Sequence, residues 1–400
     1  MLIPMIFRNL RHLRLALSVA ELQSLTKASL ACFVTQPAAS QAIAKLERDA
    51  GGLVFDRGPN TLTLTPRGHI LVARIKRAMA LLDPALNEVA PGLWRTASFA
   101  QLQALIAVVE AENFTLAARR LNMAQPTIHR AITQLEQQAG RTLFNRTTSG
   151  TLPNRACLAL ANALRLAFYE LTQAEAEMAE FDGREVGHIV IGALPLSRSA
   201  LLPQALVRFR TLRPNLPVQI IDGPYERLLA GLRHGEIDVI IGALRDPAPI
   251  GDIHQEHLFD DSLVLLAGND HPLAHRHDLA LGELARFPWI VPSLGTPTRQ
   301  QFDALFAQAG IAPPTSILES GSILLMREML GLSPHLGCIS RQQALAEVTK
   351  GLLTVLDFAT QLPLRPIGLT LRSNWQPTAA QRQMLNLLRD AAPSLAAQRA

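Results

Sequence analysis

The chain has 400 residues, 48% of them hydrophobic, so at roughly 100 to 200 residues per domain it can build several globular cores. Its three cysteines are odd in number and widely spaced, which favours buried thiols in a cytoplasmic protein over a disulfide framework. The longest uncharged run, residues 28–44, contains several polar residues and a proline, so we expect no membrane span, and the basic N-terminus lacks the apolar core of a signal peptide.

The net charge of +5 is concentrated in the first part of the chain. Residues 1–95 hold twelve Lys and Arg against six Asp and Glu, and residues 96–156 hold six against three. Residues 186–400 are balanced, with eighteen of each. This distribution is typical of a nucleic-acid-binding region attached to a domain of another kind, although charge alone leaves a solvated basic face open as an alternative.

One segment of the sequence occurs twice, 89 residues apart. Residues 36–47 read QPAASQAIAKLE, and residues 125–136 read QPTIHRAITQLE. Without a gap, the same offset superposes Val19 on Val108 and Phe55 on Phe144. A segment of about sixty residues is therefore duplicated, which we call the first and second copy.

In the first copy, apolar residues recur at helical spacing over residues 10–20, and Thr26 is placed to cap a short second helix. Gln36 and Pro37 open a third helix, because proline fits the first helical turn, where its missing N–H would have no partner. Residues 53–65 then alternate and turn like a small hairpin. Three helices and a hairpin predict a winged helix-turn-helix domain, and the repeat predicts the same domain for the second copy.

The third helix of such a domain has the right size for the DNA major groove, and a wing arginine can meet phosphate. A small helical bundle without DNA contacts is the alternative, but core packing does not explain why an exposed glutamine is repeated at Gln36 and Gln125, or why Glu47 returns as Glu136. The predicted DNA-binding residues are Gln36, Pro37, Ser40, Gln41, Lys45 and Arg57 in the first copy, and Gln125, Pro126, Thr127, His129, Arg130, Gln134 and Arg146 in the second.

Residues 114–136 and 140–146 of the second copy resemble the DNA-binding domain of the LysR-type transcriptional regulators. The second copy departs from the family pattern at His129, where serine is usual, and in its wing end at residues 152–156. The first copy departs in its second helix, at Ser29 and Cys32. The family usually has one such domain per subunit. We expect the second copy to be the primary DNA reader, with the first adding a second contact or a dimer surface.

A long amphipathic helix follows the second copy, with Leu160, Leu164, Phe168 and Leu171 on one stripe. The resemblance implies that this linker helix pairs two subunits, and the alternative is a helix packed on its own domain. A corresponding helix follows the first copy and is predicted to be shortened at Pro84.

From residue 186 onwards, short apolar runs alternate with helices, which predicts an α/β domain with a parallel sheet. It resembles the two-lobed effector domain of the same family, which is like the type 2 periplasmic-binding proteins. The predicted domains are residues 1–90 (first winged helix-turn-helix with a short linker helix), 96–156 (second winged helix-turn-helix), 157–183 (linker helix) and 186–400 (effector domain, with lobes at about 186–267 with 362–400 and at about 268–361).

Two loops of the effector domain, residues 195–199 and 292–299, come directly after predicted strands. Ligands in open α/β folds collect at such strand ends, where helix N-termini also offer N–H donors to anions. Facing each other from two lobes, the loops would bind a carboxylate or a polyol, unless their hydroxyls are ordinary helix caps. The predicted effector-binding residues are Ser197, Ser199, Arg245, Ser293, Thr296, Thr298 and Ser320.

A histidine cluster at residues 271–277 is the remaining candidate for chemistry. It lies in a polar loop beside Arg276 and without a clearly placed acidic or cysteine ligand, so we expect no metal site, no cofactor and no enzyme activity. The predicted function is a LysR-type regulator that binds promoter DNA as a homodimer or homotetramer and responds to a small anionic metabolite, with RNA polymerase as a further candidate partner. The alternatives are a small-molecule receptor with decayed DNA-binding domains and a metal-dependent hydrolase.

Overall fold

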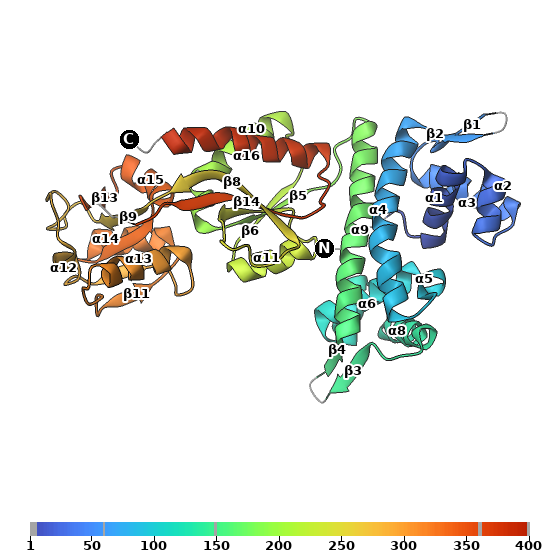
Figure 1. The fold of residues 1–400 in the computed structure, drawn as a ribbon, viewed down its shortest axis with the longest axis horizontal. Coiled ribbons are helices and arrows are strands. Elements are labelled where there is room, and N and C mark those ends of the chain that lie inside the picture. The colour runs from blue at the N-terminus through green and yellow to red at the C-terminus, as the bar shows by residue number, and fades with distance from the viewer. Residues whose placement is uncertain (1–5, 59–60, 148–149, 359–361, 398–400) are drawn as a thin grey trace. The chain divides into compact units, whose positions relative to one another are not determined.

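The computed structural model describes residues 6–58, 61–147, 150–358 and 362–397. The chain divides into two compact units, Met1–Gly187 and His188–Ala400. In Figure 1 the first unit consists of helices with two small hairpins, and the second contains two β-sheets covered by helices. Within the described ranges, none of the helices combines the length and the hydropathy that crossing a bilayer requires.

The first unit contains the two predicted winged helix-turn-helix domains. Their elements are α1 (Leu10–Leu22), α2 (Leu25–Ala31), α3 (Gln36–Asp49), β1 (Phe55–Arg57) and β2 (Leu62–Leu64) in the first copy, and α6 (Phe99–Ala111), α7 (Phe114–Leu121), α8 (Gln125–Ala139), β3 (Phe144–Thr147) and β4 (Gly150–Pro153) in the second. The second helix of the first copy is capped by Ser24, whose side chain accepts from the Lys27 N–H, and not by Thr26 as expected. Thr26 lies inside this helix, because the chain enters it two residues earlier.

One glutamate in each copy joins the third helix to the wing. Glu47 accepts backbone N–H bonds from Val54 and Phe55, at 3.0 and 3.2 Å. Glu136 does the same in the second copy, from the two residues at the same 89-residue offset, at 2.6 and 3.1 Å. We took the repetition of this glutamate to favour DNA contact, but it has a structural cause.

The helices that follow each copy are long: α4 (Pro66–Val89) and α9 (Arg155–Phe181), with the short α5 (Leu93–Thr96) between the copies. Helix α4 continues through Pro84, where we expected it to end. A helical proline costs one hydrogen bond, but Pro84 lies on the exposed side, while Leu82 and Leu86 on the other side are fully buried. Burial of these leucines holds the helix together across the proline.

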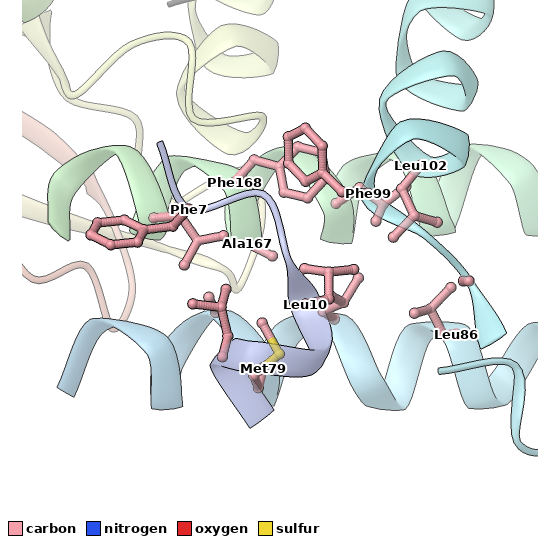
Figure 2. Packing of buried hydrophobic residues seen from close by; sticks show 14 of the residues in the cluster. Phe7, Leu10, Met79, Leu86, Phe99, Leu102, Ala167 and Phe168 are labelled. Carbon is pink, nitrogen blue, oxygen red and sulfur yellow. The ribbon is translucent and has the colours of Figure 1, made fainter. Parts of the chain in front are cut away.

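Helices α4 and α9 pack against each other in opposite directions (Figure 1). Arg67 at the start of α4 forms an ion pair with Asp182 at the end of α9, and Arg74, one or two turns further, pairs with Glu177 and Glu170, which come earlier in α9. One continuous apolar core runs from the first copy through both long helices into the second copy, and Figure 2 shows its centre. The two copies are therefore joined into one unit.

The second unit contains two five-stranded mixed sheets, in agreement with the predicted two-lobed fold. The first sheet has the order β6-β5-β7-β14-β8, with β5 (Ile189–Ala193), β6 (Val218–Ile221), β7 (Val239–Ala243), β8 (Ile253–Asp261) and β14 (Arg365–Arg372). Strand β5 pairs in parallel with β6 and β7, whereas β14 runs antiparallel to β7 and β8. The helices of this lobe are α10 (Leu201–Leu212), α11 (Tyr225–Arg233) and α16 (Ala379–Ala397).

The second sheet has the order β11-β10-β12-β9-β13, with β9 (Leu263–Ala267), β10 (Trp289–Val291), β11 (Ile317–Glu319), β12 (Leu336–Ser340) and β13 (Thr354–Val355). Its helices are α12 (Leu281–Leu284), α13 (Pro297–Gln308), α14 (Ile323–Leu332) and α15 (Arg341–Thr349). We expected residues 263–267 in the first lobe, but β9 pairs with β12 and β13 of the second sheet. The chain thus enters the second lobe about five residues earlier than residue 268.

Candidate functional site

The third helix of the second copy presents most of its predicted DNA-binding residues to solvent. Ile128, Ile132 and Leu135 are buried on one side of α8, which fixes the opposite side as the outer face. Six of the predicted side chains are exposed there: Gln125, Pro126, Thr127, His129, Arg130 and Gln134. The backbone of Arg146 lies in β3, but its side chain lies outside the described residues.

The equivalent face of the first copy is built in the same way. Ala39, Ile43 and Leu46 of α3 are buried. The predicted residues Gln36, Pro37, Gln41 and Lys45 are exposed on α3, Arg57 is exposed in the wing, and Ser40 is half-buried. Each copy therefore has a polar third helix with a free outer face of the kind that enters a major groove.

His129 is held in place on this face by its neighbours. Its ring centroid lies 5.4 Å from that of Phe114, the first residue of α7, and its Nδ1 lies 3.4 Å from the Thr133 hydroxyl. The first copy has Ser40 at this position and Leu25 in place of the phenylalanine. An imidazole offers ring nitrogens farther from the backbone than a hydroxyl does, so the two helices present different chemistry at equivalent points.

The second unit holds a cavity of about 460 Å³ that is lined from both lobes. Its walls come from the residues that follow β5, β6 and β7 in the first lobe and β10, β11 and β12 in the second. These are carboxyl ends of strands, where ligands of open α/β folds collect. Five of the seven residues predicted for the effector site line this cavity: Arg245, Ser293, Thr296, Thr298 and Ser320.

Ser197 and Ser199 are not among the lining residues, contrary to expectation. The chain after β5 folds into a 3₁₀ turn at Pro195–Arg198, which points Ser197 into the protein. Its side chain is fully buried and donates a hydrogen bond to the Leu194 carbonyl at 2.8 Å. Leu194, Pro195 and Leu196 face the cavity instead, so this wall is apolar.

The predicted hydroxyls of the second lobe already have partners. Thr296 accepts from the Arg299 N–H as the N-cap of α13 and donates to the Ser293 carbonyl. The Thr298 hydroxyl accepts from Arg365 at 2.5 Å. The cap interpretation is therefore correct for Thr296, and the cavity owes its polar character at this wall also to the N-terminal end of α13.

Arg245 is one of two arginines in the cavity lining that have a buried donor without a partner among the described atoms, and the other is Arg365. The backbone of Arg245 is fixed by two hydrogen bonds with the side chain of Gln255, at 2.8 and 2.9 Å, and its guanidinium lies 4.4 Å from the centre of the Tyr225 ring. Burial lowers the pKa of Arg245, and the nearby charge of Arg365 lowers it further. Among the described atoms, its buried Nη1 has no hydrogen-bond partner. A buried, unpaired guanidinium donor favours an anionic ligand.

Arg365 lines the same cavity and was not predicted. It forms a buried ion pair with Asp261 at 3.0 Å, next to its bond with Thr298. The only sequence signal was its place at the start of the returning strand β14, where the chain passes from the second lobe back to the first. Asp261 thus balances its charge, which no acidic partner does for Arg245 among the described ion pairs, although the buried Nε of Arg365 also has no partner among the described atoms.

Two histidines of the cluster at residues 271–277 have partners within the protein. The Nδ1 of His271 accepts from the backbone of Leu273, and His277 pairs with Asp357 at 2.7 Å. In the part of the chain that the structure describes, no three His, Cys, Asp or Glu side chains are grouped as metal ligands.

Two family descriptions match the chain. The bacterial regulatory helix-turn-helix protein of the lysR family matches twice, at residues 10–69 and 99–158, and the LysR substrate binding domain matches residues 182–393. The two helix-turn-helix matches start 89 residues apart, like the sequence repeat.

Among curated proteins, the chain is 33% identical over 387 residues to the HTH-type transcriptional regulator GalR of Pseudomonas putida, which covers 95% of this chain and 96% of that protein. It is 28% identical over 300 residues to the HTH-type transcriptional regulator PcaQ of Agrobacterium fabrum, covering 74% and 96%. The two aligned lengths differ by about one repeat.

Two solved structures share the fold. A full-length OxyR variant from Pseudomonas aeruginosa has a TM-score of 0.52 at 22% identity, covering 73% of this chain and 93% of that chain. CbnR, a LysR family regulator solved in complex with its target DNA, has a TM-score of 0.51 at 22% identity, covering 73% and 99%. With its duplicated winged helix-turn-helix and its two-lobed domain, the chain belongs to the LysR family of transcriptional regulators, which are DNA-binding proteins and not enzymes.

Proposed function

We propose that this regulator reads promoter DNA through the outer faces of α3 and α8 and is controlled by a small carboxylate bound in the cavity between the lobes. The observation that carries the effector proposal is Arg245, whose Nη1 is buried in the cavity lining without a partner among the described atoms. Leu194, Leu196 and Ile323 in the same lining favour a ligand that also has an apolar body.

Control of DNA binding follows from the position of the cavity. A ligand that contacts both lobes binds best to one arrangement of the lobes, so its binding shifts the population towards that arrangement. We place this action in the cytoplasm, where the promoter DNA is. Assembly into a homodimer or homotetramer and contact with RNA polymerase stay predictions.

Effector binding is tested in two steps. A thermal-shift screen of small carboxylates identifies the ligand, because binding to the folded state raises the melting temperature. Calorimetry then compares the wild type with Arg245→Gln, for which we expect affinity to fall about 10- to 100-fold, as a charge-assisted hydrogen bond is lost. Arg208→Gln is the control, since Arg208 is exposed and lies outside the cavity lining. Equal affinity in wild type and Arg245→Gln would contradict the proposed site.

DNA binding is tested by a mobility shift with the DNA upstream of the protein's own gene. We expect an affinity well above the non-specific level at stated salt, and a weaker complex for Arg130→Ala. The same substitution at Arg208 should have no effect. If binding is only non-specific, the interpretation as a receptor with decayed DNA-binding domains gains support.

A further inference from the structure

We propose that one chain carries a complete and asymmetric pair of DNA readers, joined by α4 and α9, and therefore recognises two unlike half-sites without a second chain. The inference rests on the proposed DNA contacts of α3 and α8. It concerns how these helices are joined and what they read.

The two long helices pair in an order that relates the copies by an approximate two-fold rotation. Along α4, the ion pairs of Arg67, Arg74 and Arg77 reach Asp182, Glu177 and Glu170, so the partners run backwards along α9. Each long helix directly follows an equivalent domain, so antiparallel pairing sets the two domains at opposite ends of the pair (Figure 1). Double-stranded DNA has the same two-fold symmetry in its backbone, which is why paired readers bind paired half-sites.

Equivalent residues of the two copies also meet this helix pair at equivalent places. In the second copy, the Phe99 ring lies 4.7 Å from that of Phe168 on α9. The residues 89 positions earlier are Leu10 and Met79, and they belong to the same buried core (Figure 2). The duplication therefore includes the joint between each domain and its long helix, not the domain alone.

The ion pairs between α4 and α9 favour pairing of these two helices with each other over pairing of either helix with a second copy of itself. Arg74 and Arg77 come from α4, and Glu170 and Glu177 come from α9, with Arg74 and Glu170 each only 5% exposed. At the positions that correspond to the two arginines, α9 has Ala163 and Leu166.

In an equivalent pairing of two α9 helices, Glu170 of each would therefore face alanine and leucine instead of arginine. A buried carboxylate without a cation is strongly unfavourable. In a pair of α4 helices, Arg77 would face Leu81 instead of Glu170, while Arg74 would keep only Glu88, at the position of Glu177. Because both α4 and α9 belong to every chain and share one core, the favourable pairing is complete within a single molecule.

The two readers differ at the positions that contact base edges. Gln36 and Pro37 are identical to their counterparts Gln125 and Pro126. The remaining positions differ: Ala38 against Thr127, Ser40 against His129, Gln41 against Arg130, and Lys45 against Gln134. Arginine reads guanine by two hydrogen bonds, whereas glutamine prefers adenine, so the two half-sites should share the bases read by the common glutamine and differ elsewhere.

Selection of binding sites from randomised DNA by the full-length protein tests the inference. The wild type should select a site with two unlike halves. Arg130→Ala should relax the base preference in one half only, and Gln41→Ala should relax it in the other half only. Mass photometry of the complex should find one chain for each pair of half-sites. If either substitution changes both halves alike, or two chains occupy one pair, the inference is wrong. If the wild type selects no sequence at all, the proposed DNA-binding function fails instead.

A second measurement does not depend on DNA. The melting temperature of the first unit should stay constant between about 0.1 and 10 µM protein, because pairing within one chain does not depend on concentration. Arg74→Glu should lower it, and Arg74→Glu with Glu177→Arg should recover part of the loss. A melting temperature that rises with concentration would mean that α4 and α9 pair between chains and would contradict the inference.

Discussion

The two winged helix-turn-helix copies differ in a consistent way. The residues that stabilise the backbone are the same in both copies. Glu47 and Glu136 each accept hydrogen bonds from two wing N–H groups. Gly51 and Gly140 both adopt the left-handed conformation after the third helix, at φ +73° and +63°. The outward-facing residues of the third helix differ at most positions, as with Ser40 and His129. Repetition of a polar residue within one chain therefore indicates a backbone role as readily as a DNA contact.

Some backbone roles are kept by different residues. Thr65 donates to the Leu53 carbonyl and accepts from the Gly68 N–H as the N-cap of α4. Asn154, at the same offset, donates to the Thr142 carbonyl and accepts from the Cys157 N–H as the N-cap of α9. The unusual wing end of the second copy thus preserves the cap, and its departure from the family pattern does not imply loss of function.

The largest effect is expected for the buried ion pairs between α4 and α9. Arg74→Leu leaves Glu170 buried without its closest cation, and we expect the first unit to lose about 3 to 5 kcal/mol. Burial disfavours the charge of Arg74, yet the hydrogen bonds that it donates to Glu177 and Glu170 raise its pKa above the ordinary range, so it is charged at all working pH values. Chemical denaturation measures the loss, with exposed Lys76→Leu as control. If only the first copy unfolds early, the copies are independent domains and not one unit.

Removing the repeated glutamates compares the copies directly. Glu136→Ala and Glu47→Ala each leave two wing N–H groups without their acceptor, which should cost about 1 to 3 kcal/mol in each case. Hydrogen exchange should rise in the wing of the altered copy and not in the other. Gln137→Ala, on the exposed side of α8, is the control. A cost in one copy only would show that the shared geometry is not equally important.

The third residue of each long helix also differs between the copies. A Cβ on Gly68 would lie 2.0 Å from the Val54 carbonyl oxygen, so Gly68→Ala should destabilise the first copy by about 1 to 3 kcal/mol. At the same offset, the second copy accommodates Cys157, whose burial raises the pKa of its thiol to about 12. Cys157→Ala should cost less than about 1.5 kcal/mol. Denaturation curves that show equal costs would contradict the difference in packing.

The smallest effect concerns the cap of the reading helix. The Thr35 side chain accepts from the Ala38 N–H at the start of α3, whereas α8 begins after Ala124, which has no capping side chain. Thr35→Ala should therefore cost about 1 kcal/mol, and Ala124→Thr should add up to that amount. Thermal melts of both single variants and of the exchanged pair measure this. An unchanged melting temperature for Ala124→Thr would mean that α8 is limited by other contacts.

Most of the fold follows from the sequence, because the repeat and the apolar periodicity depend on local spacing. Pro84 was misinterpreted because its effect depends on which side of α4 is exposed, and that is set by the helix packed against it. The pairing of α4 with α9 was missed for the same reason. An apolar stripe on α9 shows that a partner exists, but not that the partner is α4 of the same chain.

The candidate cavity was predicted in part. The two loops that follow strands could be found from strand order, and five predicted residues line the cavity. Ser197 was placed wrongly because a 3₁₀ turn of four residues reverses its side chain, and the sequence carries no clear signal for that turn. Arg365 was missed because it comes to the cavity from the returning strand, about seventy residues after the loop it contacts.

The shared core of the first unit also bears on how the regulator acts when it is scarce. Two readers that must meet by diffusion separate at low abundance, and their occupancy of DNA then falls with the square of protein concentration. Readers fixed in one chain stay at a constant effective concentration with respect to each other. In a cell with few molecules of this protein, every molecule would therefore carry a complete pair of DNA-binding helices. Occupancy of the DNA site would rise in direct proportion to expression.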